Sequence, residues 1–100
     1  MEKLNELFPK KEGKELKLWN GGGHGRYQNN TLYVAAYSQK QCAEMVSAVC
    51  FGGRTTNIST HEIKNYYNVG RWGTAMDGVI PKEPQVWVRE DYNLKPERIL

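Results

Sequence analysis

The sequence lacks the features of several large classes of protein. No apolar run in its 100 residues approaches the roughly 20 residues that a membrane-spanning helix needs. The segment from Met1 to Leu7 also lacks the apolar stretch of a secretory signal peptide. We therefore expect a cytoplasmic protein that has no membrane partner.

Cysteine and histidine are scarce, with two of each. Cys42 and Cys50 lie in a segment with helical spacing, which separates them by about 12 Å along the axis, whereas disulfide Cα atoms lie within about 7 Å. We predict two reduced thiols in the core. With His24 and His61 on other elements and no C-x-x-C or H-x-x-x-H spacing, the sequence argues against a structural metal, and no motif indicates a cofactor.

Neither sign of charge dominates the chain. Fourteen Lys and Arg residues face eleven Asp and Glu residues, which gives a net charge of +3. This balance permits an anionic partner, but it lacks the dense basic patch expected of a dedicated nucleic-acid-binding protein. We therefore do not expect nucleic acid to be the partner.

Hydrophobic periodicity indicates three strands. Residues 15–19 alternate between polar and apolar, as half-buried strands do. Residues 85–89 are predicted to form the last strand. Residues 31–37 are almost continuously apolar and rich in β-forming residues, which predicts a central strand that is buried on both faces. Between the first two strands, residues 20–26 contain four glycines and are predicted to form a loop.

Two capping boxes predict two helices. Ser38 with Gln41 precedes apolar residues at helical spacing, which predicts the clearest helix of the chain. Ser59 with Glu62 has the same pattern and predicts a second helix that runs to about residue 67.

In chain order these elements give β-β-α-α-β, an α+β fold with a small, three- to four-stranded, mainly antiparallel sheet and two helices. The chain length fits one such domain, which we place at residues 15–90. Residues 1–14 are interpreted as an N-terminal helical turn or tether. Residues 91–100 are interpreted as a poorly anchored C-terminal tail.

A repeated dipeptide supplies the candidate binding residues. Gly-Arg occurs at 25–26, 53–54 and 70–71, each time in a predicted loop. Arginine offers a planar fork of donors that suits phosphate, and glycine lets main-chain N–H groups approach an anion closely. If the three loops converge, Arg26, Arg54 and Arg71 would form an anion site. The alternative is that they are solvent-exposed turn residues, because loops favour both residue types.

Aromatic residues on the same loops would complete such a site. Tyr27 and Trp72 could stack on a nucleobase, which is worth about 1–3 kcal/mol per base. His24 could donate to an anion, although no partner for general-base catalysis is evident. Four other aromatic residues fall on predicted strands and are assigned to the core or to cross-strand pairs, namely Trp19, Tyr33, Tyr37 and Trp87. The candidate ligand-binding residues are His24, Arg26, Tyr27, Arg54, Arg71 and Trp72, and no catalytic residue is assigned.

Four segments between residues 16 and 89 resemble a loose group of short proteins encoded by bacteriophages. They are Trp19-Asn20-Gly21, residues 34–38, residues 72–78 and Val86-Trp87-Val88. The resemblance assigns no catalytic residue. Because small phage proteins often counter host defence, it implies a counter-defence role in an infected bacterium, by analogy of size and origin alone.

The first hypothesis is a non-enzymatic phage protein that binds a phosphate-bearing ligand, such as a cyclic nucleotide signal. A homo-oligomer is expected to complete the pocket, because one small domain offers little concave volume. One alternative is an inhibitor that binds a host defence protein directly, since Tyr, Trp and Arg also serve as interface anchors. Another is a DNA-binding protein that uses the two-helix unit. An enzyme is the last option, because no set of acid, base and nucleophile is visible.

Overall fold

The computed structural model describes most of the chain from residue 15 onward. The described residues are 15–23, 27, 31–50, 58–63, 72–73, 75–91 and 93–100. The elements are β1 (Lys17–Gly22), β2 (Leu32–Ala36), α2 (Gln39–Val49), β3 (Ser59–Glu62), β4 (Gln85–Val88) and β5 (Glu97–Arg98). The turn or tether expected at residues 1–14 lies outside the described residues.

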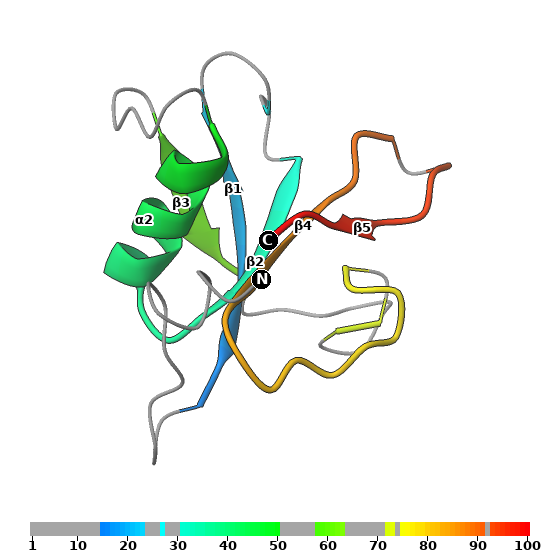
Figure 1. The fold of residues 1–100 in the computed structure, drawn as a ribbon, viewed down its shortest axis with the longest axis horizontal. Helices are drawn as coiled ribbons and strands as arrows, with labels where there is room; N and C mark the ends of the chain where they lie inside the picture. Colours follow the sequence, from blue (N-terminus) through cyan, green and yellow to red (C-terminus); the bar gives the residue numbers. More distant parts are fainter. Residues whose placement is uncertain are drawn as a thin grey trace.

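Five strands form one sheet in the order β3-β1-β2-β4-β5, and every neighbouring pair is antiparallel (Figure 1). The α+β class predicted from the sequence is thus confirmed. The prediction of three to four strands and two helices is wrong in detail, because the described residues form five strands and one helix. None of the described helices is long and apolar enough to cross a membrane.

Strand β2 occupies the centre of the sheet, as its apolar composition predicts. Leu32, Val34 and Ala36 are fully buried on the face covered by α2, and Ala35 is fully buried on the opposite face. A strand that carries apolar residues at successive positions is stable only where both of its faces are covered. The central position of β2 satisfies that requirement.

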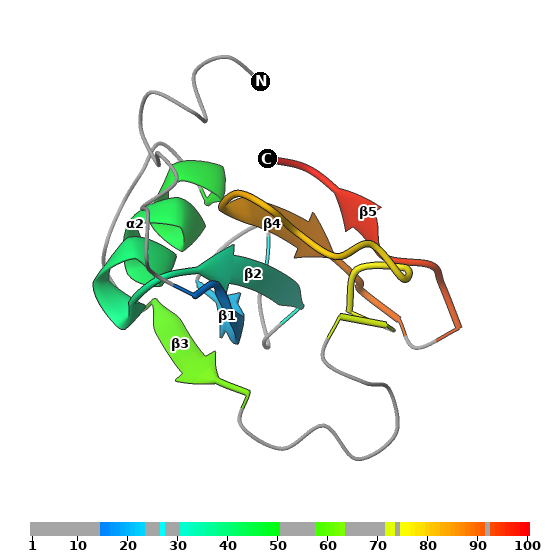
Figure 2. The same cartoon turned by 90° about the horizontal axis from the view of Figure 1, so that it is seen from below.

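Helix α2 covers one face of the sheet (Figure 2). The Ser38 hydroxyl accepts a hydrogen bond from the Gln41 backbone N–H at 3.1 Å, which confirms the predicted N-cap. The Gln41 side chain accepts from the backbone N–H of Tyr37 at 2.8 Å, one residue before the position of a standard capping box. The buried face of the helix then packs Cys42 and Val46 against the sheet.

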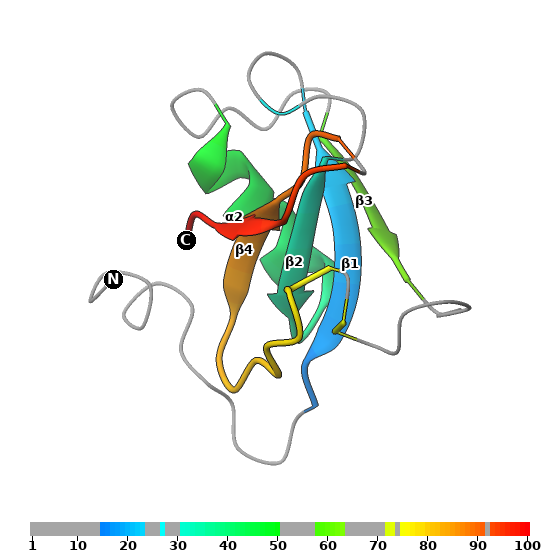
Figure 3. The ribbon, with the colours of Figure 1, turned by 90° about the vertical axis from the view of Figure 1, so that its right-hand side faces the viewer.

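The opposite face of the sheet is covered by the segment that begins at Trp72 (Figure 3). Ala75 and Met76 pack there against Leu18, Ala35 and Trp87 in a second core cluster. The indole Nε1–H of Trp87 donates to the side-chain oxygen of Gln85 at 2.7 Å, so both buried polar groups are satisfied. This glycine-rich segment has no regular secondary structure, and it covers the second face of the sheet in place of a helix.

The helix predicted to start at Ser59 is wrong, since residues 59–62 form β3. They pair with Trp19–Gly22 of β1, and the ladder continues where the Ile63 N–H donates to the Leu18 carbonyl at 2.9 Å. Main-chain pairing with β1 outweighs the local capping signal, because without β3 that edge of β1 would keep its backbone groups unsatisfied by the sheet. The rest of the predicted helix, residues 64–67, lies outside the described residues.

The loop predicted at residues 20–26 begins later than expected. Strand β1 continues through Gly21 and Gly22, which pair with β2 and β3. A Cβ atom at Gly21 would lie 2.8 Å from Cγ2 of Val46, so glycine is needed here for the close approach of α2 to the strand.

The C-terminal segment is also better anchored than the sequence suggests. Within residues 91–100, β5 pairs with β4, and the Ile99 N–H donates to the Val86 carbonyl at 2.9 Å. The side chains of Ile99 and Leu100 pack against the cluster under α2. Strand β5 consists of two polar residues and has no hydrophobic periodicity. Only the apolar residues that follow it, Ile99 and Leu100, could have indicated that this segment packs on the sheet.

Candidate functional site

Four of the six candidate residues predicted from the sequence lie outside the described residues. They are His24, Arg26, Arg54 and Arg71. The convergence of the three Gly-Arg turns therefore stays a prediction. Tyr27 and Trp72 are described.

Tyr27 belongs to the core on the α2 side of the sheet. Its exposed fraction is 7%, and its carbonyl accepts a hydrogen bond from the Gly23 N–H at 2.8 Å. Burial raises the pKa of the Cys50 thiol, and a hydrogen bond from the Tyr27 backbone partly opposes that rise. Tyr27 thus connects the β1–β2 loop to the end of α2, which is a packing role.

The two cysteines are free and buried, as predicted. Burial alone raises the pKa of Cys42 to about 12. A thiol in this state is protonated at neutral pH and is a poor nucleophile. The cysteines therefore belong to the core and contribute nothing to a reactive site.

Trp72 packs on the other face of the sheet, against the cluster that contains Trp87 and Met76. The structure does not bring Trp72 and Tyr27 together, because the sheet lies between their two clusters. Trp72 is only partly buried, and its neighbour Gly73 lines an open hollow.

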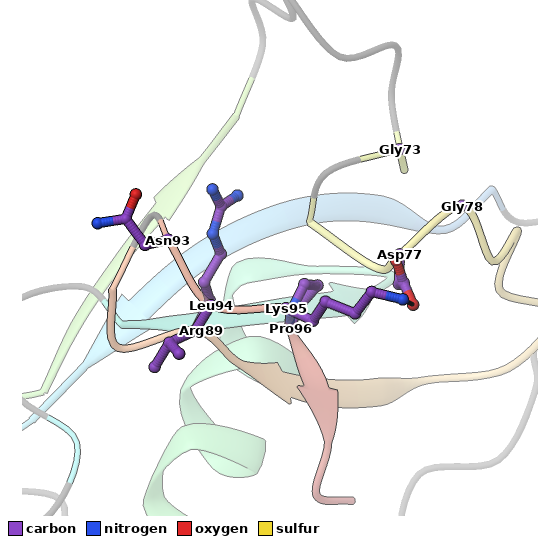
Figure 4. A pocket seen from close by; sticks show the side chains of 8 residues that line it. All are labelled: Gly73, Asp77, Gly78, Arg89, Asn93, Leu94, Lys95 and Pro96. Atoms are coloured by element: carbon purple, nitrogen blue, oxygen red, sulfur yellow. Dashed lines mark ion pairs between the residues drawn. The ribbon is translucent and has the colours of Figure 1, made fainter.

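The hollow has a volume of about 480 Å³ and lies between two segments that are distant in sequence (Figure 4). One wall is the turn at residues 73–78, and the other is the connection from β4 to β5. The lining residues are Gly73, Asp77, Gly78, Arg89, Asn93, Leu94, Lys95 and Pro96.

The first wall is a tight turn held by its own backbone. The Gly78 N–H donates to the Gly73 carbonyl at 2.8 Å, and the Met76 N–H donates to the Trp72 carbonyl at 2.9 Å. Asp77 and Gly78 have φ angles of 48° and 81°, a left-handed conformation that aspartate tolerates and glycine favours. Because Met76 is fully buried below the turn, the backbone of Asp77 is anchored at the rim of the hollow.

The second wall starts from the sheet itself. The Arg89 N–H donates to the Thr31 carbonyl at 2.9 Å, which extends the β2–β4 ladder by one residue. Arg89 comes two residues after Trp87 and therefore lies on the same face of the sheet, away from α2. Beyond it, the Asp91 carboxylate accepts from the Asn93 N–H at 2.9 Å and forms an Asx turn.

One ion pair joins the two walls. The Lys95 ammonium lies 3.8 Å from the Asp77 carboxylate, and the two side chains are 84% and 49% exposed. An ion pair with this exposure contributes at most about 1 kcal/mol, so a ligand can separate it at low cost. The side chains of Arg89 and Lys95 extend in different directions from the second wall, and that of Lys95 turns toward Asp77 (Figure 4).

The chemistry of the lining residues suits binding. Arg89, Lys95 and Asn93 can donate hydrogen bonds to anionic oxygens, and Gly73 and Gly78 leave their backbone open to close approach. The lining residues that the structure describes include no histidine, cysteine or serine. Among the described residues, no three His, Cys, Asp or Glu side chains are grouped to hold a metal ion.

Sequence reasoning missed Arg89, Asn93, Lys95 and Asp77. Two local signals were present, namely the Asp77-Gly78 turn dipeptide and the Asp91-x-Asn93 spacing of an Asx turn. The alternation of β4 also places Arg89 on the same face as Trp87. No signal in the sequence indicates that residues 73–78 lie over that face.

No family model, curated protein or solved structure matches this chain. The geometry and chemistry of the hollow are therefore the basis for a functional proposal.

Proposed function

We propose that this protein is a non-enzymatic binding protein that holds a phosphate-bearing ligand, such as a cyclic nucleotide, in the hollow beside Trp72. The observation that carries the proposal is that Arg89, Asn93 and Lys95 line one open hollow opposite Gly73 and Gly78. Arg89, Lys95 and Asn93 are the donors.

The size of the hollow supports a small ligand. Pockets that bind small molecules occupy roughly 300–1,000 Å³, and the volume of about 480 Å³ falls within that range. Pro96 and the exposed side chain of Leu94 add apolar surface on which a base or sugar could lie. Trp72, which is partly buried against the second core cluster, directly precedes the lining residue Gly73.

The resemblance to short phage proteins suggests a biological setting for this binding. A protein that sequesters a cyclic nucleotide in the cytoplasm of an infected bacterium would deprive a host defence enzyme of its signal. A second copy of the chain would add volume to an open site.

One further observation favours a second candidate, an inhibitor that binds a host defence protein. The large exposed apolar side chains among the described residues are Val79, Ile80 and Leu94. Leu94 lines the hollow, and Val79 directly follows Gly78 of its other wall. Exposed apolar side chains beside cationic residues also suit a protein partner. The DNA-binding alternative loses support, because residues 59–62 form a strand where its recognition helix was expected to begin.

Isothermal titration calorimetry with purified protein and a panel of cyclic mono- and dinucleotides tests the proposal. Charge-assisted hydrogen bonds contribute about 1.5–3 kcal/mol, so we expect Arg89→Gln to weaken binding by about tenfold or more. Lys40→Gln, which removes an exposed lysine on α2, is the matched control and should change nothing. Ile80→Ser should also leave nucleotide affinity unchanged.

Two results would contradict the proposal. One is the absence of binding to every nucleotide at millimolar concentration. The other is binding that Arg89→Gln leaves intact, which would place the ligand elsewhere. Specific association with a purified defence enzyme that Ile80→Ser abolishes would instead support the inhibitor.

A further inference from the structure

The Asp77–Lys95 ion pair places a protein carboxylate where an anionic ligand needs a cation. Both residues line the hollow, and the Lys95 ammonium lies 3.8 Å from the Asp77 carboxylate. The Arg89 side chain extends in another direction, so the pair involves Lys95 and not Arg89 (Figure 4). The carboxylate of Asp77 is therefore the anion that the Lys95 ammonium faces, and a phosphate that uses this ammonium has to replace it.

The two partners differ in their freedom to move. The backbone on both sides of the pair is anchored, because Met76 is buried beside Asp77 and Pro96 is buried beside Lys95. Aspartate has a short side chain, whereas the ammonium of lysine is carried on a long, flexible stem. The Lys95 side chain is 84% exposed, so packing does not restrain it. When the pair separates, the ammonium is therefore the group that can move to a ligand, while the carboxylate stays near its turn.

The strength of the pair limits how well the carboxylate can compete. Exposed ion pairs are weak, so a pair with exposures of 84% and 49% lowers the affinity for a competing anion by at most about fivefold. An ammonium that moves from a carboxylate to a phosphate exchanges one charge-assisted contact for another. The exchange is therefore nearly balanced, and removal of one of the two competing anions should change the affinity for the other.

We infer that Lys95 exchanges the Asp77 carboxylate for an anionic group of the ligand, and that Asp77 is an autoinhibitory contact that lowers the affinity of the hollow for anions. The inference rests on the proposed function of the same site. Its consequence is a change of sign, because the loss of a lining residue's charge strengthens binding instead of weakening it.

Asp77→Asn is the first test variant. Asparagine has nearly the same shape, tolerates the left-handed φ of 48° and carries no charge, so the turn should be preserved. We expect calorimetry with 3′,5′-cyclic AMP to show binding that is about two- to fivefold tighter than in the wild type. Glu90→Gln removes an exposed carboxylate that does not line the hollow, and this control should stay within about 1.5-fold of the wild type. Circular dichroism and thermal melting check that both variants fold.

A Lys95→Gln background separates competition for Lys95 from simple repulsion between Asp77 and the ligand. Lys95→Gln alone should weaken binding by about twofold or more, because it removes a charged donor. In that background Asp77 has no ammonium to compete for, so the further change Asp77→Asn should tighten binding by less than about 1.5-fold. An equal gain in both backgrounds would mean that the carboxylate acts by repulsion alone and would overturn the exchange.

The Lys95 side chain can also be followed directly by NMR in ¹³C-labelled protein. We expect the Cε–Hε resonance of Lys95 to shift saturably with cyclic AMP, while that of Lys40, an exposed lysine on α2, stays unchanged. A Lys95 resonance that does not respond to bound ligand, or an unchanged affinity in Asp77→Asn, would overturn the exchange. The proposed function would stand in that case if Arg89→Gln still weakened binding. The absence of binding at millimolar cyclic AMP and at millimolar concentrations of the other nucleotides would overturn both.

Discussion

At Gly21, a single missing side chain allows helix and strand to approach each other. A Cβ atom there would lie 2.8 Å from Cγ2 of Val46 and 3.3 Å from the carbonyl oxygen of Ser59. Valine is stiff at χ1, and the carbonyl belongs to the β3 backbone, so neither neighbour can move freely. The contact between α2 and the β1–β3 pair therefore depends on this glycine.

We expect Gly21→Ala to destabilise the protein by about 1–3 kcal/mol, the usual cost of overpacking a well-packed core. Chemical denaturation measures the change. Gly21→Ala combined with Val46→Ala returns space at the same contact, so the double variant should lose less stability than the sum of the two single losses. Strict additivity would show that the two residues do not compete for space.

The residues of the candidate site could be predicted only in part from their neighbours in the sequence. Tyr27 was assigned to a ligand because it lies on a glycine-rich loop, but its ring is buried in the core. Arg89 and Lys95 were not singled out, because each has ordinary neighbours in the sequence. They line a hollow only because the turn at residues 73–78 lies opposite them, and no local sequence pattern predicts that arrangement.

At the scale of elements, α2 follows its sequence closely, because its start is determined by local interactions. The Ser38 hydroxyl and the Gln41 side chain satisfy backbone N–H groups within four residues of themselves. Such short-range contacts can be predicted from spacing alone.

We therefore predict that Ser38→Ala lowers stability by about 1 kcal/mol, which corresponds to a fall in Tm of about 4–8 °C for a chain of this size. Ser38→Asp supplies another oxygen acceptor at the N-cap and should restore the melting temperature. Equal losses in both variants would show that Ser38 acts through some contact other than the cap. Differential scanning calorimetry provides the measurement.

Strands β3 and β5 could not be predicted in the same way. Both are short and polar, and both are stabilised by partners that are distant in sequence, β1 for β3 and β4 for β5. The Ser59–Glu62 spacing even favours the wrong element. Strands β2 and β4 were predictable because they are rich in apolar residues, as buried strands are.

At the scale of the whole molecule, the sheet separates two packed faces that are covered to different extents. Helix α2 closes one side with the larger core cluster, and the irregular segment from Trp72 closes the other side less completely. The hollow opens where that segment meets the β4–β5 connection. Its existence depends on the docking of β5, which the sequence did not predict. The α+β class was therefore predictable, and the described site was not.

The central claim is that the hollow between residues 73–78 and 89–96 binds a nucleotide. The most direct measurement is a titration of ¹⁵N-labelled protein with a cyclic mononucleotide, followed amide by amide in heteronuclear NMR spectra. We predict saturable shifts at Gly73, Gly78, Asn93 and Lys95, while the amides of α2 stay unchanged. Shifts confined to other parts of the protein, or no shifts at millimolar ligand, would contradict the claim.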